Sequence, residues 1–145
     1  MRFLIVFLTL LMPAAAMAEL LVESAWSRAT VPGARSGVVY ATLTNPGDNP
    51  VTITGVESEL AHHVMVHETV MVDDMMQMRH RDAVTVAAGE TVLLEPGGLH
   101  IMLMGLSSQL REGENFGVTL VTGDDDRFEV NVSVGAIGQM EAPAK

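Results

Sequence analysis

The sequence predicts an all-β fold, an antiparallel β-sandwich of about seven to nine strands in a single domain. Three observations support this prediction. Most of the chain alternates apolar and polar residues with a period of two, which is the pattern of half-buried strands. Turn-forming residues interrupt this alternation about every eight to twelve residues, as they do in sandwiches. Only residues 58–61 and 106–110 have a composition that could form a helical turn.

The N-terminal predicted strands are bounded by proline and glycine. Residues 20–28 form the first strand, in which we expect Trp26 to be buried. Val31-Pro32-Gly33 ends this strand, because proline lacks the N–H group that a sheet ladder requires. Residues 38–44 form the second strand, and Asn45-Pro46-Gly47-Asp48 follows it as a turn.

The middle of the chain contains shorter alternations. Residues 51–58 place valine and isoleucine among threonines, which favours a third strand. Residues 63–69 and 75–81 flank an acidic turn, and we expect them to pair as a hairpin. Two short strands are predicted at 84–87 and 91–94, separated by residues that break the alternation.

Three further strands complete the predicted sheet. Residues 100–106 follow Pro96-Gly97-Gly98, which is a turn sequence. Residues 116–122 and 127–134 are joined by Gly123-Asp124-Asp125-Asp126. We interpret this acidic run as a solvated hairpin turn and not as a calcium site, because the further ligands of a calcium loop are missing.

Residues 1–18 are expected to be a cleavable export signal. Arg2 supplies positive charge, residues 3–12 are apolar, and Ala16-Met17-Ala18 is a small-x-small cleavage site. The apolar run is short for a transmembrane span. No cysteine follows it, so we expect no lipid-modified N-terminus. The prediction is one soluble exported domain at residues 19–145, which does not contact the membrane after cleavage.

Charge and cysteine content limit the possible functions. The formal net charge is −10, which argues against binding to nucleic acid or to an anionic membrane. Because the chain has no cysteine, it can form no disulfide, perform no thiol redox chemistry and build no blue-copper site. The motifs of nucleophilic hydrolases, phosphate loops and zinc proteases are also missing, so we expect no enzyme.

Imidazole and thioether side chains are concentrated between His67 and Met102. Together these two ligand types suit Cu(I), a soft cation, and suit hard cations poorly. His100 and Met102 are two residues apart on a predicted strand, so they face the same way with Cα atoms roughly 6–7 Å apart. Both side chains can therefore reach one ion.

The length of the loop in the predicted hairpin decides whether His67 and Met78 can bind the same ion as His100 and Met102. A two-residue loop at 73–74 pairs His67 with His80, whereas a four-residue loop at 71–74 pairs it with Met78. Either loop of even length puts His67 and Met78 on one face. A loop of odd length separates them unless a β-bulge intervenes.

Other methionines and histidines nearby have roles that the pattern leaves open. Met65 lies on the face of His67 and is the first candidate for a substitute ligand or a hydrophobic shield. His80 is the rival of Met78 in the hairpin. A methionine on a strand is usually a core residue, and we expect the core to contain several of Met71, Met75, Met76 and Met104.

The spacing of these ligands resembles a known signature. His67, ten intervening residues, Met78, twenty-one intervening residues and then His100-x-Met102 is similar to the motif of the periplasmic copper chaperone family called PCuAC. Four segments around the motif also resemble that family, namely 25–30, 37–45, 66–68 and 96–103.

This resemblance implies a cupredoxin-like sandwich that binds Cu(I) through His67, Met78, His100 and Met102. It also implies delivery of copper to an acceptor protein, either the copper subunit of a respiratory oxidase or its assembly factor. The chain departs from the family at residues 139–145, which are not a histidine- and methionine-rich tail. A second copper site in the tail is therefore not expected.

Two other classes of protein remain open. One is an interaction sandwich without metal, whose methionine-rich face docks a peptide, because methionine surfaces adapt to different partners. The other is a copper enzyme, for which the sequence contains no indication of a substrate pocket. Convergence of the four candidate ligands would support a copper carrier, and their dispersal would support the docking surface.

Overall fold

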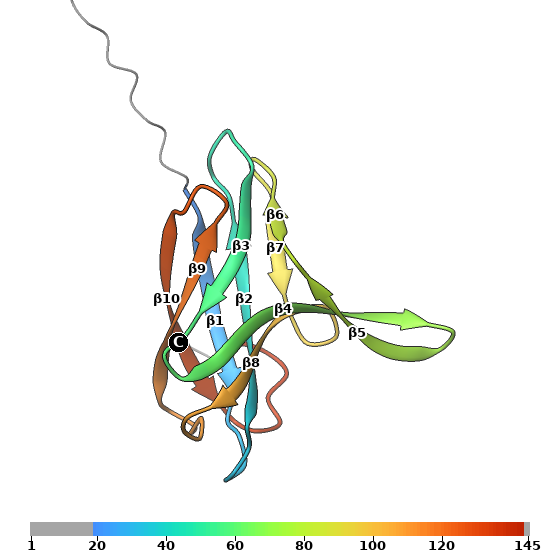
Figure 1. Cartoon of the computed structure of the whole chain (residues 1–145), viewed down its shortest axis with the longest axis vertical. Coiled ribbons are helices and arrows are strands. Elements are labelled where there is room, and N and C mark those ends of the chain that lie inside the picture. Colours follow the sequence, from blue (N-terminus) through green and yellow to red (C-terminus); the bar gives the residue numbers. More distant parts are fainter. Residues whose placement is uncertain (1–18, 144–145) are drawn as a thin grey trace, which may run out of the picture.

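Ten strands form the regular structure of residues 19–143, the part of the chain that the computed structural model describes (Figure 1). The export signal predicted at 1–18 lies outside the described residues. The strands are β1 (Leu21–Arg28), β2 (Ser36–Thr44), β3 (Val51–Glu57), β4 (Ala61–Val72), β5 (Met75–Arg81), β6 (Val84–Val86), β7 (Thr91–Leu94), β8 (Leu99–Leu106), β9 (Asn115–Thr122) and β10 (Arg127–Gly135).

The all-β prediction is confirmed. Each of the ten strands overlaps one of the ten segments predicted from the sequence, so the stated range of about seven to nine strands was too low by one. Within the described part of the chain, there is no helix long and apolar enough to cross a membrane.

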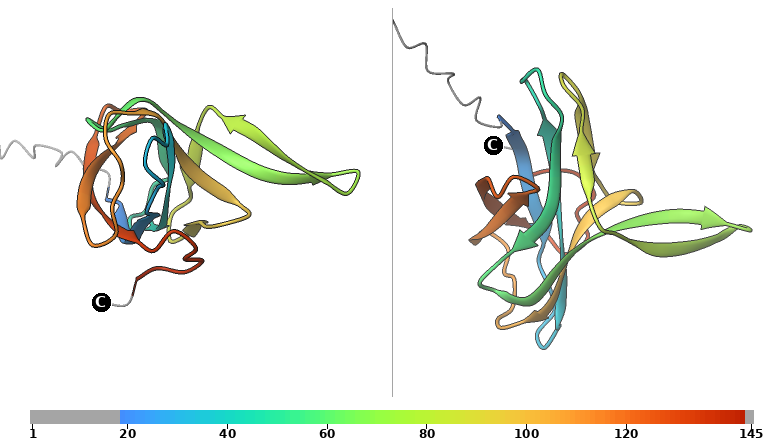
Figure 2. Two further views of the ribbon diagram at one scale, coloured as in Figure 1. Left: turned by 90° about the horizontal axis from the view of Figure 1, so that it is seen from below. Right: turned by 45° about the horizontal axis from the view of Figure 1, so that its top comes forward.

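Hydrogen bonds join the strands in the order β5-β4-β8-β7-β2-β1-β10-β9-β3-β6, with a further pairing between β8 and β2. Neighbours are antiparallel except for β1 with β10 and β7 with β8, which are parallel. Figure 2 shows that this sheet curls over on itself, with β9 and β10 on the side opposite to β8. A single sandwich results, with the core between its layers.

Alternate residues of the strands form this core. Val39, Ala41 and Leu43 of β2 are buried, as are Ile101 and Leu103 of β8. Because successive residues of a strand point to opposite faces, the intervening residues of β8 lie on the face away from the core. That face carries the histidine and methionine side chains of the predicted site.

The hairpin of β4 and β5 projects from the sandwich (Figures 1 and 2). β4 pairs with β8 from Ala61 to Glu68 and with β5 from Val66 to Val72, so residues 66–68 have a strand on both sides. Asp73 and Asp74 form the turn with φ angles of 50° and 61°, the type I′ conformation that suits two-residue hairpin loops. The outer part of this hairpin, residues 69–78, is called the arm below.

Candidate metal centre

His67 of β4 lies between two other histidines. It is directly opposite His100 of β8 on one side and directly opposite His80 of β5 on the other. Of the two loops that the sequence allowed, the structure contains the two-residue loop. The four-residue alternative, which would pair His67 directly with Met78, does not form.

Methionines flank the histidines in the same register. Met65 lies opposite Met102. Met78 lies opposite Thr69, which is two residues beyond His67 on β4. Directly opposite residues share a face, and so do residues two apart on one strand. All six candidates therefore lie on one face of the sheet, away from the core: Met65, His67, Met78, His80, His100 and Met102.

The imidazole rings have a spacing that fits a shared ion. The ring centroids of His67 and His100 are 6.1 Å apart, and those of His67 and His80 are 5.8 Å apart. A ligating nitrogen lies about 2.0–2.1 Å from a metal, so two imidazoles on one ion have centroids about 5 to 6.5 Å apart. The ring planes are nearly perpendicular, at 80° and 86°, so the rings do not stack on each other.

A hydrogen bond fixes the tautomer of His100. Its Nδ1 lies 3.0 Å from the carbonyl oxygen of Gly98, and because a carbonyl only accepts, Nδ1 donates. Nε2 then keeps its lone pair for a ligand. The Gly98 carbonyl is held by a type II turn, in which Gly98 N–H donates to Glu95 and Pro96-Gly97 are the central residues. Gly97 has the positive φ of 86° that this turn requires.

Two buried nitrogen atoms have no hydrogen-bond partner among the described residues, namely Nδ1 of His67 and Nε2 of His100. His100 is only 3% exposed. An unpaired buried polar atom costs about 1–3 kcal/mol, so such an atom requires an explanation. A metal ion bound by both rings would satisfy both atoms.

His67 has the protonation state that metal binding requires. Burial is the main cause that lowers the pKa of His67 below its ordinary value of 6.5, and repulsion from the rings of His100 and His80 adds to it. The ring is therefore neutral at pH 7, and neutral imidazole is the form that binds a metal.

The methionine side chains differ in exposure. Met65 and Met102 are half-buried beside the histidines, whereas Met78 is 63% exposed on the arm and does not point into the core. Within residues 19–143, no group of three or more histidine, aspartate or glutamate side chains is arranged to hold an ion. A complete ligand set on this face therefore requires thioethers.

His80, the rival of Met78, has another partner. Its Nε2 lies 3.2 Å from the carboxylate of Asp82, and both side chains are exposed. The two-residue loop nevertheless places His80 nearer to His67 in register than it places Met78. The structure thus brings His80 close to the site while pairing it with an exposed acid.

The expectation that several methionines pack in the core is wrong. Three of the four lie on the arm, where no second layer covers them, and the fourth lies on the outer face of β8. All four are exposed: Met71, Met75, Met76 and Met104.

The sequence reasoning also missed residues of β2 that border the site. Val38 lies opposite Met102, and Tyr40 lies two residues farther along on the same face. Tyr40 packs against Trp26 with ring centroids 4.8 Å apart, and Trp26 is buried as predicted. Only the register between β2 and β8 reveals that these aromatic residues adjoin the histidine face.

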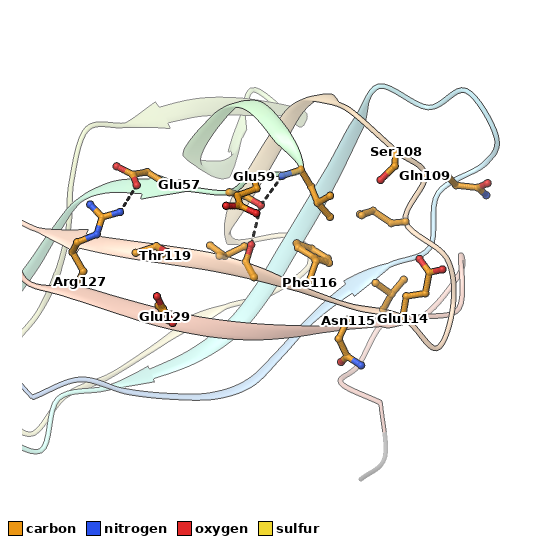
Figure 3. A pocket seen from close by; sticks show the side chains of 16 residues that line it. Glu57, Glu59, Ser108, Gln109, Glu114, Asn115, Phe116, Thr119, Arg127 and Glu129 are labelled. Atoms are coloured by element: carbon orange, nitrogen blue, oxygen red, sulfur yellow. Dashed lines mark hydrogen bonds and ion pairs between the residues drawn. The ribbon is translucent and has the colours of Figure 1, made fainter.

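A separate hollow of about 810 Å³ contains no histidine or methionine (Figure 3). Glu57 and Arg127 form an ion pair in its wall, and the hydrogen bond from Arg127 lowers the pKa of the Glu57 carboxyl group. Three further acids line it, namely Glu59, Glu114 and Glu129. This hollow has no soft ligands and does not belong to the candidate site.

Comparison with known proteins gives the family. The family model described as "Putative lipoprotein LpqE-like" matches residues 20–134, and the chain belongs to this LpqE-like family. A relative from Leifsonia xyli subsp. xyli (strain CTCB07), described as "Putative lipoprotein Lxx21020", is 33% identical over 114 residues. The match covers 78% of this chain and 68% of the relative. The sequence of this chain contains no cysteine.

Solved structures with the same fold are PCuAC domains and related proteins. The apo PCuAC domain of PmoF2 matches with a TM-score of 0.72 at 24% identity, over 87% of this chain and 98% of that one. The solution structure of CuI-DR1885 from Deinococcus radiodurans matches with a TM-score of 0.67 at 31% identity, over 87% of this chain and 85% of that one. The PCuAC-like, cupredoxin-like fold that the motif implied is therefore confirmed.

Proposed function

We propose that this chain is a periplasmic metallochaperone that binds Cu(I) through His67, Met78, His100 and Met102. The observation that carries the proposal is the cross-strand pair of His67 and His100, each with one buried nitrogen that has no hydrogen-bond partner within residues 19–143. Support also comes from DR1885, which is 31% identical and whose solved structure is described as the CuI form.

The proposed ligands favour Cu(I) over Cu(II). Two thioethers and two neutral imidazoles carry no charge, so they do little to neutralise Cu(II), a harder ion that prefers tetragonal nitrogen and oxygen ligands. Thioethers also persist in an oxidising compartment, where thiolates are lost to disulfides. This ligand set therefore suits a copper carrier that works outside the cytoplasm.

The unequal exposure of the ligands supports a direction for copper release. His100 is buried and its ring is fixed by Gly98, whereas Met78 is exposed on the arm. An acceptor can therefore displace Met78 first and bind the ion before His100 releases it. Cu(I) would leave by stepwise exchange of ligands, without a change in its oxidation state.

The proposed acceptor is the copper centre of a respiratory oxidase or an assembly factor that serves it. The chain would meet this acceptor after export and removal of residues 1–18. In this function copper is the cargo of the chain and not a cofactor of catalysis.

Separate titration of the purified protein with Cu(I) and with Cu(II), followed by mass spectrometry, tests this function. We expect the first equivalent of Cu(I) to bind tightly and Cu(II) to bind weakly. Equal affinity for both ions, or no retained Cu(I), would contradict the proposal.

A second candidate function is a metal-free docking surface for a peptide. The observation that favours it is the exposure of Met71, Met75 and Met76 on the arm, because exposed methionines adapt to different partners. A docking surface would bind its partner equally well with and without copper. Binding of the partner only to the copper-loaded protein would support the copper carrier over the docking surface.

A further inference from the structure

The arm carries four methionines that contribute to no core. Met71, Met75, Met76 and Met78 are between 63% and 68% exposed. Burial of such a side chain would stabilise the fold, and on the arm this contribution is not realised. Packing in the described part of the chain therefore does not explain why thioethers occupy these positions.

Three of the four methionines share the face of the proposed copper site. Met71 lies directly opposite Met76, and Met76 and Met78 are two apart on β5, so all three point to the face of His67. Met75 lies opposite Val72 and therefore points to the other face. The face of His67 thus continues outward along the arm as a row of thioethers.

The backbone geometry brings Met71 and Met76 close together. The amide of Thr69 donates to the carbonyl of Gly98, so at this position β4 directs its hydrogen bonds toward the β8 side and not toward β5. Met71, two residues farther on, has the same orientation, so Met71 and Met76 form a pair of the non-hydrogen-bonded type. Cα atoms in such a pair are about 4.5 Å apart, which is the closer of the two antiparallel spacings.

A soft cation can be bound by this group of thioethers. Met78 lies roughly 6–7 Å along the strand from Met76, and methionine is unbranched with three rotatable bonds, so the three sulfurs can converge. Ligands that are all thioethers select Cu(I) over harder ions. Asp73 and Asp74 at the adjoining turn add negative charge that attracts a cation.

We propose that Met71, Met76 and Met78 form a second Cu(I) site made only of thioethers, at the outer end of the arm. This inference rests on the proposed function, because Met78 belongs to both sites and passes the ion between them. At each step one copper–ligand bond forms as another breaks, and copper remains Cu(I). The arm is then the position at which copper enters or leaves the carrier.

Methionine-methyl NMR during an anaerobic Cu(I) titration tests this proposal. The first equivalent should shift the signals of Met78 and Met102. The second should shift those of Met71 and Met76 and shift Met78 again, because Met78 exchanges between the two ions, while Met75 stays unchanged. The double variant Met71→Leu/Met76→Leu should lose the response to the second equivalent. It should also transfer Cu(I) to a chromophoric chelator about tenfold more slowly, equal to about 1.4 kcal/mol of barrier.

Met75→Leu is the matched control, because Met75 is as exposed as Met71 and lies on the opposite face of the same arm. It should keep both titration steps and the parent rate of transfer. Unchanged signals of Met71 and Met76, with a parent transfer rate in the double variant, would overturn the arm site alone. A first equivalent of Cu(I) that leaves the signal of Met102 unchanged would overturn the proposed four-ligand site and with it the proposed function. A response of Met71 and Met76 in that case would still support the arm site, and no response would overturn both.

Discussion

His67 and His100 lie directly opposite each other on β4 and β8, and each keeps one buried ring nitrogen without a hydrogen-bond partner in the described part of the chain. The carbonyl of Gly98 fixes one ring, and two rigid strands hold both backbones. Such an arrangement is organised before a ligand arrives, which reduces the cost of ordering a binding site.

Replacement of the two sulfur ligands should weaken copper binding with little effect on folding. Leucine nearly preserves the volume and apolar character of methionine. The variant Met78→Leu/Met102→Leu should bind Cu(I) at least about a hundredfold more weakly, equal to about 2.8 kcal/mol. Chemical denaturation of the apo protein should show a loss of less than about 1.5 kcal/mol.

The matched control for this variant is Met75→Leu/Met104→Leu, which makes the same two changes on the same two strands. Neither residue belongs to the proposed four-ligand site, so the affinity for the first Cu(I) should equal that of the parent. Parent-like affinity in the Met78→Leu/Met102→Leu variant would instead show that the four-ligand hypothesis is wrong.

Single substitutions can show whether Met78 or His80 is the fourth ligand of Cu(I). His80 is exposed and paired with Asp82, so His80→Ala should change Cu(I) affinity by less than about threefold, which is less than about 0.7 kcal/mol. Met78→Leu should cost about tenfold or more. Competition with a Cu(I) chelator measures both values. A larger loss in His80→Ala than in Met78→Leu would make His80 the fourth ligand.

Gly97 should affect the copper site through the tautomer of His100. Gly97→Ala places a side chain at a φ of 86° in the turn that holds the Gly98 carbonyl. Strain at such a position costs about 1–3 kcal/mol of stability. Because His100 then loses a well-placed acceptor for its Nδ1 proton, Cu(I) affinity should also fall, as measured by chelator competition.

Gly89→Ala is the control for this effect, because Gly89 has a similar φ of 72° and a Cβ there would meet no atom within 4 Å, as at Gly97. Both variants should lose stability, and only Gly97→Ala should lose affinity. Equal affinity in the two variants would mean that the turn has no influence on the metal ligands.

The pH dependence of Cu(I) binding should follow the lowered pKa of His67. Burial, and then repulsion from His100 and His80, keeps this ring neutral to a lower pH than its ordinary value of 6.5. Proton competition at His67 should therefore begin only below pH 6.5 and remain incomplete, because thioethers do not protonate. NMR titration of the His67 ring and parallel affinity measurements check this, and an affinity that already falls above pH 7 would contradict it.

The lowered pKa of His67 also predicts how the stability of the apo protein depends on pH. Between pH 6.5 and the lower pKa of His67 in the folded state, the unfolded chain binds more protons than the folded one. The free energy of unfolding therefore decreases as the pH falls through this window. His67→Gln should remove this contribution, which denaturation at several pH values would detect.

The sequence by itself determined the fold class, the chemical type of the metal ligands and which residues of a strand share a face. Period-two alternation is local, so it places Ile101 in the core and puts His100 and Met102 together on the other face. The acidic pair Asp73-Asp74 predicted a turn, and an even loop was enough to put His67 and Met78 on one face. The absence of cysteine left imidazole and thioether as the soft ligands.

Only the tertiary structure decided which residues meet across strands. The pattern within β4 does not specify its neighbours. Hydrogen bonds to the more distant strand β8 place His67 opposite His100. The length of the hairpin loop, which the sequence left open between two values, places it opposite His80. The tautomer of His100 depends on a local contact with the Gly98 carbonyl, which the alternation of apolar and polar residues does not specify. The exposure of Met71 was also hidden from the sequence, because burial depends on a second layer of the sandwich, and the arm extends beyond that layer.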